Sequence, residues 1–156
     1  MTELCARIAF GMLNGINLST GRELLRRAGS VESVFTRSEA EMAAVMGRSG
    51  GIADGEYRRG VVARAEREEV FVGASSVRPL FFTDDNYPQR LLDCDDAPAM
   101  LYAIGDTPLD SMRTVAIVGT RHSTAYGLEF TERLVRGLAE MYGNVAIISG
   151  LAYGID

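Results

Sequence analysis

Two short apolar runs separated by the length of one helix constrain the fold more than any other feature of this chain. The first, Val115 to Val118, ends at Gly119, and the second, Val145 to Ile148, follows Gly143-Asn144. Between them, residues 126–142 place apolar side chains on one helical face. Continuous apolar runs of this kind are typical of strands buried on both faces of a parallel sheet. The pattern therefore predicts an α/β fold with a strand–helix–strand unit and a right-handed crossover.

Each predicted strand is followed by a loop with groups suited to phosphate binding. Gly119-Thr120-Arg121 follows the first strand, and Ser-Gly-Leu-Ala-Tyr-Gly-Ile-Asp, residues 149–156, follows the second. The carboxyl ends of parallel strands form the edge where α/β sheets bind ligands, and backbone amides, hydroxyls and guanidinium groups hold phosphates there. The predicted phosphate-binding residues are Gly119, Thr120, Arg121, Ser149, Gly150 and Gly154. The same glycines are also compatible with tight strand-to-helix turns that bind nothing.

The first 75 residues have the pattern of short helices separated by glycine. Four helices are predicted, around Leu4 to Met12, from a Ser19 or Thr20 cap to Gly29, from a Ser38–Glu41 capping box to Gly47, and from about residue 56 to residue 72. The last of these is polar and is interpreted as a connector. From residue 77 the pattern changes to β-like runs, residues 77–82 and 100–104, with turn residues between them. The change predicts a domain boundary near residue 75.

Several classes of site are excluded or disfavoured by residue counts. Cys5 and Cys94 are the only cysteines and belong to no CxxC or Cys/His cluster, so we predict neither a disulfide framework nor a metal site. His122 is the only histidine, which excludes any Ser-His or Cys-His pair that does not use it. No cofactor is predicted. The apolar runs are too short to cross a bilayer and no signal peptide is recognised, so a cytoplasmic protein without membrane association is expected.

The charge distribution limits the extent of any nucleic-acid interface. The formal net charge is −5, which argues against a surface covered by nucleic acid but allows a local basic patch. All 16 basic residues are arginine, which makes bidentate contacts with phosphate, although a GC-rich genome is the simpler explanation.

The motifs taken together resemble those of one known family. Residues 115–121, Tyr126-Gly127 and residues 149–156 are similar, in order and spacing, to the strand, Gly-Ser/Thr-Arg, Tyr-Gly and Ser-Gly-x-Ala-x-Gly-Ile-Asp blocks of the DprA/Smf family. The residues upstream resemble the stretch that precedes the family's Rossmann-like domain, namely Tyr87-Pro88, Leu91-Leu92, Asp96-Ala97-Pro98, Leu101-Tyr102 and Gly105.

The resemblance implies a fold, a function and a role for individual residues. Residues 1–75 are expected to form a helical SAM-like or helix-hairpin-helix-like module, and residues 76–156 the N-terminal part of a truncated Rossmann-like DNA-binding domain. The family binds single-stranded DNA in natural transformation and recombination, protects incoming DNA and assists loading of the RecA recombinase, without catalysis. Arg121 is implied as a phosphate ligand, in a pocket shaped by Gly119, Thr120 and Gly150. A homodimer is implied for the full-length protein.

Several other features of the sequence have only weak functional signals. Gly15-Ile16-Asn17-Leu18 resembles the Gly-x-Gly hairpin of helix-hairpin-helix DNA binders, but Asn17 replaces the second glycine, which favours a structural or protein-contact role. The arginines that follow are interpreted as a solvated helix face, namely Arg22, Arg26 and Arg27. Tyr126 and Tyr153 could stack on bases and His122 could contact phosphate, but none of these three is predicted as a site residue.

The sequence is also compatible with two functions other than DNA binding. Rossmann-type phosphoribohydrolases also hold phosphates with glycine-rich loops at strand ends, but their Pro-Gly-Gly-x-Gly-Thr-x-x-Glu block is missing here. The second alternative is a protein-docking module in residues 1–75 attached to a scaffold. Because a single strand–helix–strand unit cannot cover both faces of a sheet, exposed apolar surface is also predicted.

Overall fold

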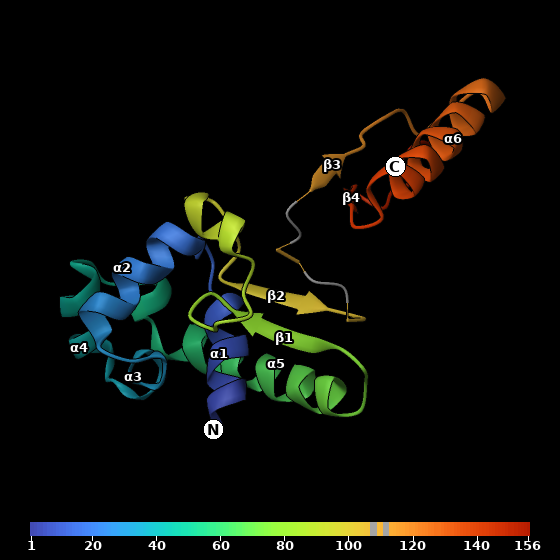
Figure 1. Cartoon of the computed structure of the whole chain (residues 1–156). Coiled ribbons are helices and arrows are strands. Elements are labelled where there is room, and N and C mark those ends of the chain that lie inside the picture. The colour runs from blue at the N-terminus through green and yellow to red at the C-terminus, as the bar shows by residue number, and fades with distance from the viewer. Residues whose placement is uncertain (107–108, 111–112) are drawn as a thin grey trace. The chain divides into compact units, whose positions relative to one another are not determined.

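The computed structural model describes residues 1–106, 109–110 and 113–156. The chain forms two compact units, Met1–Asp106 and Thr107–Asp156 (Figure 1), which are described separately.

The first unit begins with five α-helices. They are α1 (Glu3–Gly11), α2 (Leu18–Ala28), α3 (Val31–Thr36), α4 (Glu39–Met46) and α5 (Gly55–Gly73), with a 3-10 turn, η1 (Gly51–Ala53), before the last. The four helices predicted from the sequence are confirmed. The additional helix α3 was missed because it is only six residues long and half of its side chains are β-branched, although Ser30 caps it.

The helix boundaries follow their capping residues, and one of them differs from the prediction. The capping box of α4 is present, since Ser38 and Glu41 each bond the other's backbone amide, and Gly47 ends the helix in the left-handed region at φ 68°. In α2 the cap is Asn17, not Ser19 or Thr20. The Asn17 carboxamide accepts the amide of Thr20 at 2.9 Å, and the Thr20 hydroxyl accepts the amide of Asn17 at 2.9 Å. Thr20 therefore takes the third helical position of a capping box.

Helix α5 is a core helix, not the connector that its polar composition suggested. It makes the most extensive contact of any element with α1, and it buries Val61, Ala65 and Val72. Its Tyr57 hydroxyl accepts the backbone amide of Asn14 at 2.8 Å, which fixes the loop between α1 and α2. A few buried apolar residues are sufficient to anchor the helix, and among its charged residues Arg58 is buried with them.

A β-hairpin completes the first unit and packs into the same core. Strands β1 (Arg78–Phe81) and β2 (Met100–Ala103) pair antiparallel, with Phe81 opposite Met100. The rings of Phe81 and Phe82 lie 5.7 and 6.3 Å from the ring of Phe10 in α1. The first unit therefore extends past the boundary predicted near residue 75, because the apolar side of the hairpin is buried by the helices.

The segment that joins the two strands of the hairpin is also fixed to the core. It contains a 3-10 turn, η2 (Gln89–Asp93), and the fully buried Tyr87, whose hydroxyl donates to the carbonyl of Pro98 at 2.6 Å. Burial raises the pKa of this tyrosine, which therefore remains a neutral hydrogen-bond donor.

The second unit is the predicted strand–helix–strand. Strand β3 (Thr114–Ala116), helix α6 (Ala125–Tyr142) and strand β4 (Ala146–Ile148) follow each other, and the strands pair in parallel with Val115 opposite Ile147. The parallel pairing confirms the α/β prediction for this part of the chain. Thr124 caps α6, since its hydroxyl accepts the amide of Gly127 at 3.1 Å.

Burial in the second unit differs from what the apolar runs suggested. Among the residues that the structure describes, every fully buried side chain belongs to the first unit. Val118 is 82% exposed and Met141 on α6 is 72% exposed. One helix cannot cover a two-stranded sheet, so the prediction of exposed apolar surface is confirmed and the prediction of strands buried on both faces is not. In the described part of the chain, no helix is long and apolar enough to cross a membrane.

Candidate phosphate-binding site

Two loops meet at the carboxyl ends of β3 and β4. The first contains Gly119, Thr120 and Arg121, and the second is residues 149–156. The amide of Ile155 donates to the carbonyl of Thr120 at 3.2 Å, and the amide of Gly119 donates to a carboxylate oxygen of Asp156 at 2.7 Å. These two hydrogen bonds bring together the parallel strand ends that were predicted to share one edge.

Gly154 forms the tightest contact between the loops. Its φ is 110°, a region that residues with a side chain rarely adopt. A Cβ at this position would overlap the carbonyl oxygen of Thr120 and lie 2.8 Å from the Cα of Arg121. The backbone of residue 154 therefore touches the backbone of residues 120 and 121, and only glycine allows this.

Two other glycines of the predicted site also lie close to the end of the second loop. A Cβ at Gly119 would lie 2.6 Å from Cγ2 of Ile155, and a Cβ at Gly150 would lie 2.9 Å from a carboxylate oxygen of Asp156. Gly119 was predicted to let the backbone approach a phosphate, but its amide is already bonded to Asp156. Ile155 therefore leaves no room for a side chain at Gly119, whereas at Gly150 only the end of the Asp156 side chain lies close.

The polar groups that remain toward solvent are compatible with an anion. Thr120, Arg121, Ser149 and Gly150 are all exposed. The Thr120 hydroxyl accepts the amide of His122 at 3.2 Å, and the Ser149 hydroxyl accepts the amide of Leu151 at 3.2 Å; among the described residues neither hydroxyl donates a hydrogen bond. Within the described chain, Arg121 forms no ion pair. Guanidinium groups and hydroxyls of this kind are donors suited to phosphate oxygens.

The second loop also holds two large side chains in water. Leu151 adopts a φ of 50°, which is unusual for a residue other than glycine, and it is 91% exposed. Tyr153 is 93% exposed. Backbone strain of this kind costs about 1–3 kcal/mol and is concentrated at functional sites. The sequence contained no signal for the strain at Leu151, because leucine has no preference for the left-handed region.

The hairpin near Asn17 does not offer amides to a phosphate. Asn17 has an extended conformation, with φ −130°, and not the left-handed one of a Gly-x-Gly hairpin. The first amides of α2 are occupied, since Leu18 donates to the carbonyl of Ala97 at 2.7 Å and Ser19 donates to that of Asp95 at 3.1 Å. These bonds agree with the structural role inferred for Asn17.

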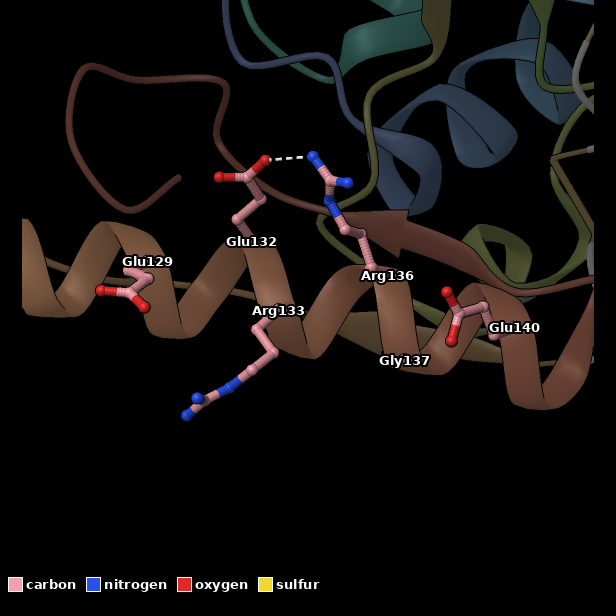
Figure 2. A pocket seen from close by; sticks show the side chains of 6 residues that line it. All are labelled: Glu129, Glu132, Arg133, Arg136, Gly137 and Glu140. Carbon is pink, nitrogen blue, oxygen red and sulfur yellow. Dashed lines mark hydrogen bonds and ion pairs between the residues drawn. The ribbon is translucent and has the colours of Figure 1, made fainter.

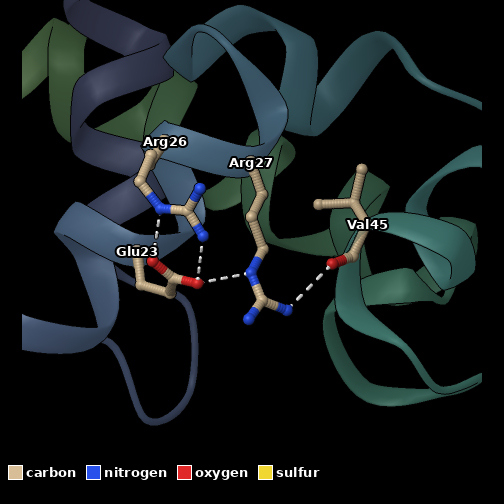
Figure 3. A network of polar contacts seen from close by, with 4 residues as sticks. All are labelled: Glu23, Arg26, Arg27 and Val45. Carbon is tan, nitrogen blue, oxygen red and sulfur yellow. Dashed lines mark hydrogen bonds and ion pairs between the residues drawn. The ribbon is translucent and has the colours of Figure 1, made fainter.

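The arginines of α2 are engaged with a neighbouring glutamate. Figure 3 shows Arg26 and Arg27 converging on Glu23, with donor–acceptor distances of 2.5–2.7 Å. Hydrogen bonds from Arg26 and Arg27 lower the pKa of Glu23 to about 2, so the glutamate stays ionised and neutralises one of the two cations. The solvated helix face predicted from the sequence is consistent with this arrangement.

A charged hollow on α6 has no connection with the two loops. It is lined by Glu129, Glu132, Arg133, Arg136, Gly137 and Glu140, all from one face of the helix. Figure 2 shows Arg136 paired with Glu132, while Arg133 points away from that pair. Three glutamates and two arginines line it, so the hollow has no single charge to offer a ligand. No group of His, Cys, Asp and Glu among the described residues could hold a metal ion.

Comparison with known proteins identifies relatives for the second half of the chain. The family model for "DNA recombination-mediator protein A" matches residues 78–156. Curated relatives include the "Putative DNA processing protein DprA" of Mycobacterium tuberculosis, 46% identical over 69 residues, and the "DNA processing protein DprA" of Bacillus subtilis, 44% identical over 71 residues. The matched regions cover 43% and 45% of this chain but only 17% and 23% of those proteins.

A solved structure resembles the whole chain. The X-ray structure of DNA processing protein A from Streptococcus pneumoniae aligns with a TM-score of 0.63 and 22% sequence identity. The alignment covers 100% of this chain and 52% of that one. At this level of identity the similarity shows that the fold is shared, with helices at the N-terminus followed by a Rossmann-like domain.

Proposed function

This chain belongs to the DNA recombination-mediator protein A family, the DprA/Smf family, and we propose that it binds single-stranded DNA through the joined loops after β3 and β4. In this proposal Thr120, Arg121, Ser149 and Gly150 face a backbone phosphate. Gly119 and Gly154 give the site its shape by allowing the loops to touch.

One observation carries the proposal. Gly154 packs directly on the backbone of Thr120 and Arg121, so the second loop touches the backbone from which the exposed Arg121 side chain, with no ion-pair partner in the described chain, extends. Arginine binds phosphate in a bidentate manner, and such charge-assisted hydrogen bonds are about twice as strong as neutral ones. The net charge of −5 makes a local site of this kind a better match to the chain than binding over its whole surface.

We also propose the biological setting from the family. The relatives in Bacillus subtilis and Streptococcus pneumoniae are named DNA processing proteins, and the family acts in natural transformation and recombination. The proposed role is to protect incoming single-stranded DNA and to assist RecA loading in the cytoplasm, as a homodimer of the full-length protein. The proposed activity is binding without catalysis.

Substitution of Arg121 tests the site. Arg121→Ala should lower the affinity for a single-stranded oligonucleotide about 10- to 150-fold, the equivalent of about 1.5–3 kcal/mol for hydrogen bonds to a charged group. The melting temperature should change little, because Arg121 is exposed. Arg133→Ala is the matched control, since Arg133 is an exposed arginine of the same unit that lies on α6.

The salt dependence of the DNA affinity and an assay for released base distinguish DNA binding from phosphoribohydrolase activity. The logarithm of the affinity should fall with the logarithm of salt concentration, with a slope of about 0.7 for each phosphate contacted. Unchanged affinity in Arg121→Ala would remove this residue from the site. Release of free base from nucleoside monophosphates would instead indicate a phosphoribohydrolase and contradict a protein that only binds.

A further inference from the structure

We propose that Tyr153 forms a stacking surface for an unpaired nucleobase beside the phosphate held at Arg121. The inference rests on the function proposed above and adds to it a second contact of different chemistry, to the base and not to the backbone. The two contacts together would make the site specific for a strand whose bases are exposed.

The positions of the two residues follow from the contact at Gly154. A Cβ on Gly154 would lie 2.8 Å from the Cα of Arg121, so the two backbones are in direct contact there. Tyr153 immediately precedes Gly154 in the chain. An aromatic ring and a guanidinium are therefore presented from adjacent backbone positions on two different loops. In a single strand each phosphate is followed by a base, so the two groups of one nucleotide can meet the two side chains.

The loop that carries Tyr153 is fixed before any ligand binds. On one side of Tyr153, the amide of Leu151 is bonded to the Ser149 hydroxyl at 3.2 Å. On the other side, the amide of Ile155 is bonded to the carbonyl of Thr120 at 3.2 Å. A ring held by a fixed loop loses little conformational entropy on binding, and tyrosine has only two side-chain torsions to restrict.

Tyr153 differs from the other exposed tyrosines of the second unit in having no partner for its ring. Tyr126 lies 6.3 Å from the ring of Phe130, and Tyr142 lies under the guanidinium of Arg113 at 5.3 Å. Tyr153 is 93% exposed and makes no ring or cation contact with any residue that the structure describes. Both faces of its ring are therefore available to a base, and Leu151, at 91% exposure, adds a second apolar side chain to the same loop.

A comparison of two oligonucleotides isolates the base contact. The full chain is titrated with a thymidine oligonucleotide and with an abasic strand of the same length and charge. Tyr153→Ala should lower the affinity for the thymidine strand about 5- to 150-fold, as expected for the stacking of one base, and leave the affinity for the abasic strand unchanged. Tyr153→Phe should bind like the wild type. Tyr142→Ala is the matched control, because it removes an exposed tyrosine at the other end of α6.

A fluorescent variant provides a second measurement that does not depend on loss of affinity. The sequence contains no tryptophan, so Tyr153→Trp introduces a single one. Its emission should be quenched by the thymidine strand and much less by the abasic strand. Wild-type affinity of Tyr153→Ala for both strands, or binding of the thymidine strand without quenching, would overturn the stacking contact and leave the phosphate site intact. Failure of the wild type to bind either strand would refute the proposed function itself.

Discussion

A carboxylate oxygen of Asp156 accepts the backbone amide of Gly119 at 2.7 Å, so the last residue of one loop occupies the first amide of the other. The second oxygen of the same carboxylate lies 2.9 Å from where a Cβ of Gly150 would be. Asp156 therefore joins the first loop to the second through Gly119 and lies close to Gly150 of its own loop. A negative charge at such a site opposes anion binding, so its contribution must come from holding the loops together.

Substitution of Asp156 should distinguish this positioning role from a purely electrostatic one. In Asp156→Ala the Gly119 amide loses its partner, and we expect weaker binding of single-stranded DNA because the loops are no longer tied. In Asp156→Asn the side-chain oxygen can still accept the bond and the negative charge is gone, so the affinity should equal or exceed that of the wild type. Titration of each variant with single-stranded DNA, at low and at high salt concentration, measures these affinities. Equal affinities of the alanine and asparagine variants would show that the bond does not hold the site.

Gly154→Ala should abolish binding for a steric reason. Both this variant and Gly143→Ala place a side chain at a positive φ, at a cost of about 1–2 kcal/mol each. Gly154 is in contact with Thr120 and Arg121, however, whereas nothing lies within 4 Å of a Cβ at Gly143. Thermal melting should therefore reveal a loss in both variants, larger in Gly154→Ala because of the added overlap with Thr120, and DNA titration a loss in Gly154→Ala alone. Preserved binding in Gly154→Ala would mean that the loop contact is dispensable.

Local patterns in the sequence were sufficient to predict most elements of the fold. The apolar runs around Val115 and Ile147 identified the parallel strands, and the Ser38–Glu41 spacing identified a capping box, because both depend on residues close in the chain. The domain boundary predicted near residue 75 does not coincide with the division between the two units, which follows Asp106. The contact of Phe81 with Phe10 joins segments far apart in sequence, and composition alone contains no record of such packing.

The candidate site was also predicted in part. The sequence placed the strand-end glycines and Arg121 at one edge of the sheet, because parallel strands have their carboxyl ends together, and the two loops do meet there. The detailed use of the residues differed. Asp156 was seen only as part of a motif, and its bond to Gly119 depends on the path of the second loop. The left-handed backbone conformation of the exposed Leu151 could not be predicted from the sequence. A residue other than glycine is held in this conformation by the surrounding structure and not by its own preference.

Asn17 should matter for stability and not for DNA binding. Asn17→Ala removes the acceptor for the Thr20 amide, and loss of such a cap costs about 1 kcal/mol of unfolding free energy. Affinity for single-stranded DNA should be unchanged, because the next two amides donate to Ala97 and Asp95. Asn17→Gly is the complementary variant, since it restores the Gly-x-Gly pattern of a DNA-binding hairpin. A gain of affinity in Asn17→Gly would contradict the assignment of this hairpin to the core.

Arg58 should be the most sensitive charged residue of the helical unit. It is 3% exposed, and its guanidinium donates to the carbonyls of Val34 at 2.6 Å and Arg37 at 2.8 Å, at the end of α3. Burial lowers the pKa of this arginine, but the carbonyl ends of a helix favour a cation. Arg58→Met fills a similar volume but leaves these carbonyls without a donor. We expect a loss of about 2–4 kcal/mol in unfolding free energy, measured by denaturant titration.

The neighbouring Arg59 provides the control for this prediction. Arg59 is exposed, so Arg59→Met should change the unfolding free energy by no more than about 0.5 kcal/mol. Arg58→Lys should recover only part of the loss, because an ammonium group on a flexible chain cannot reproduce the planar fork that reaches several carbonyls at once. If Arg58→Met and Arg59→Met were equally stable, the carbonyls at the end of α3 would have to be satisfied by water, and Arg58 would not be needed to join α3 to α5.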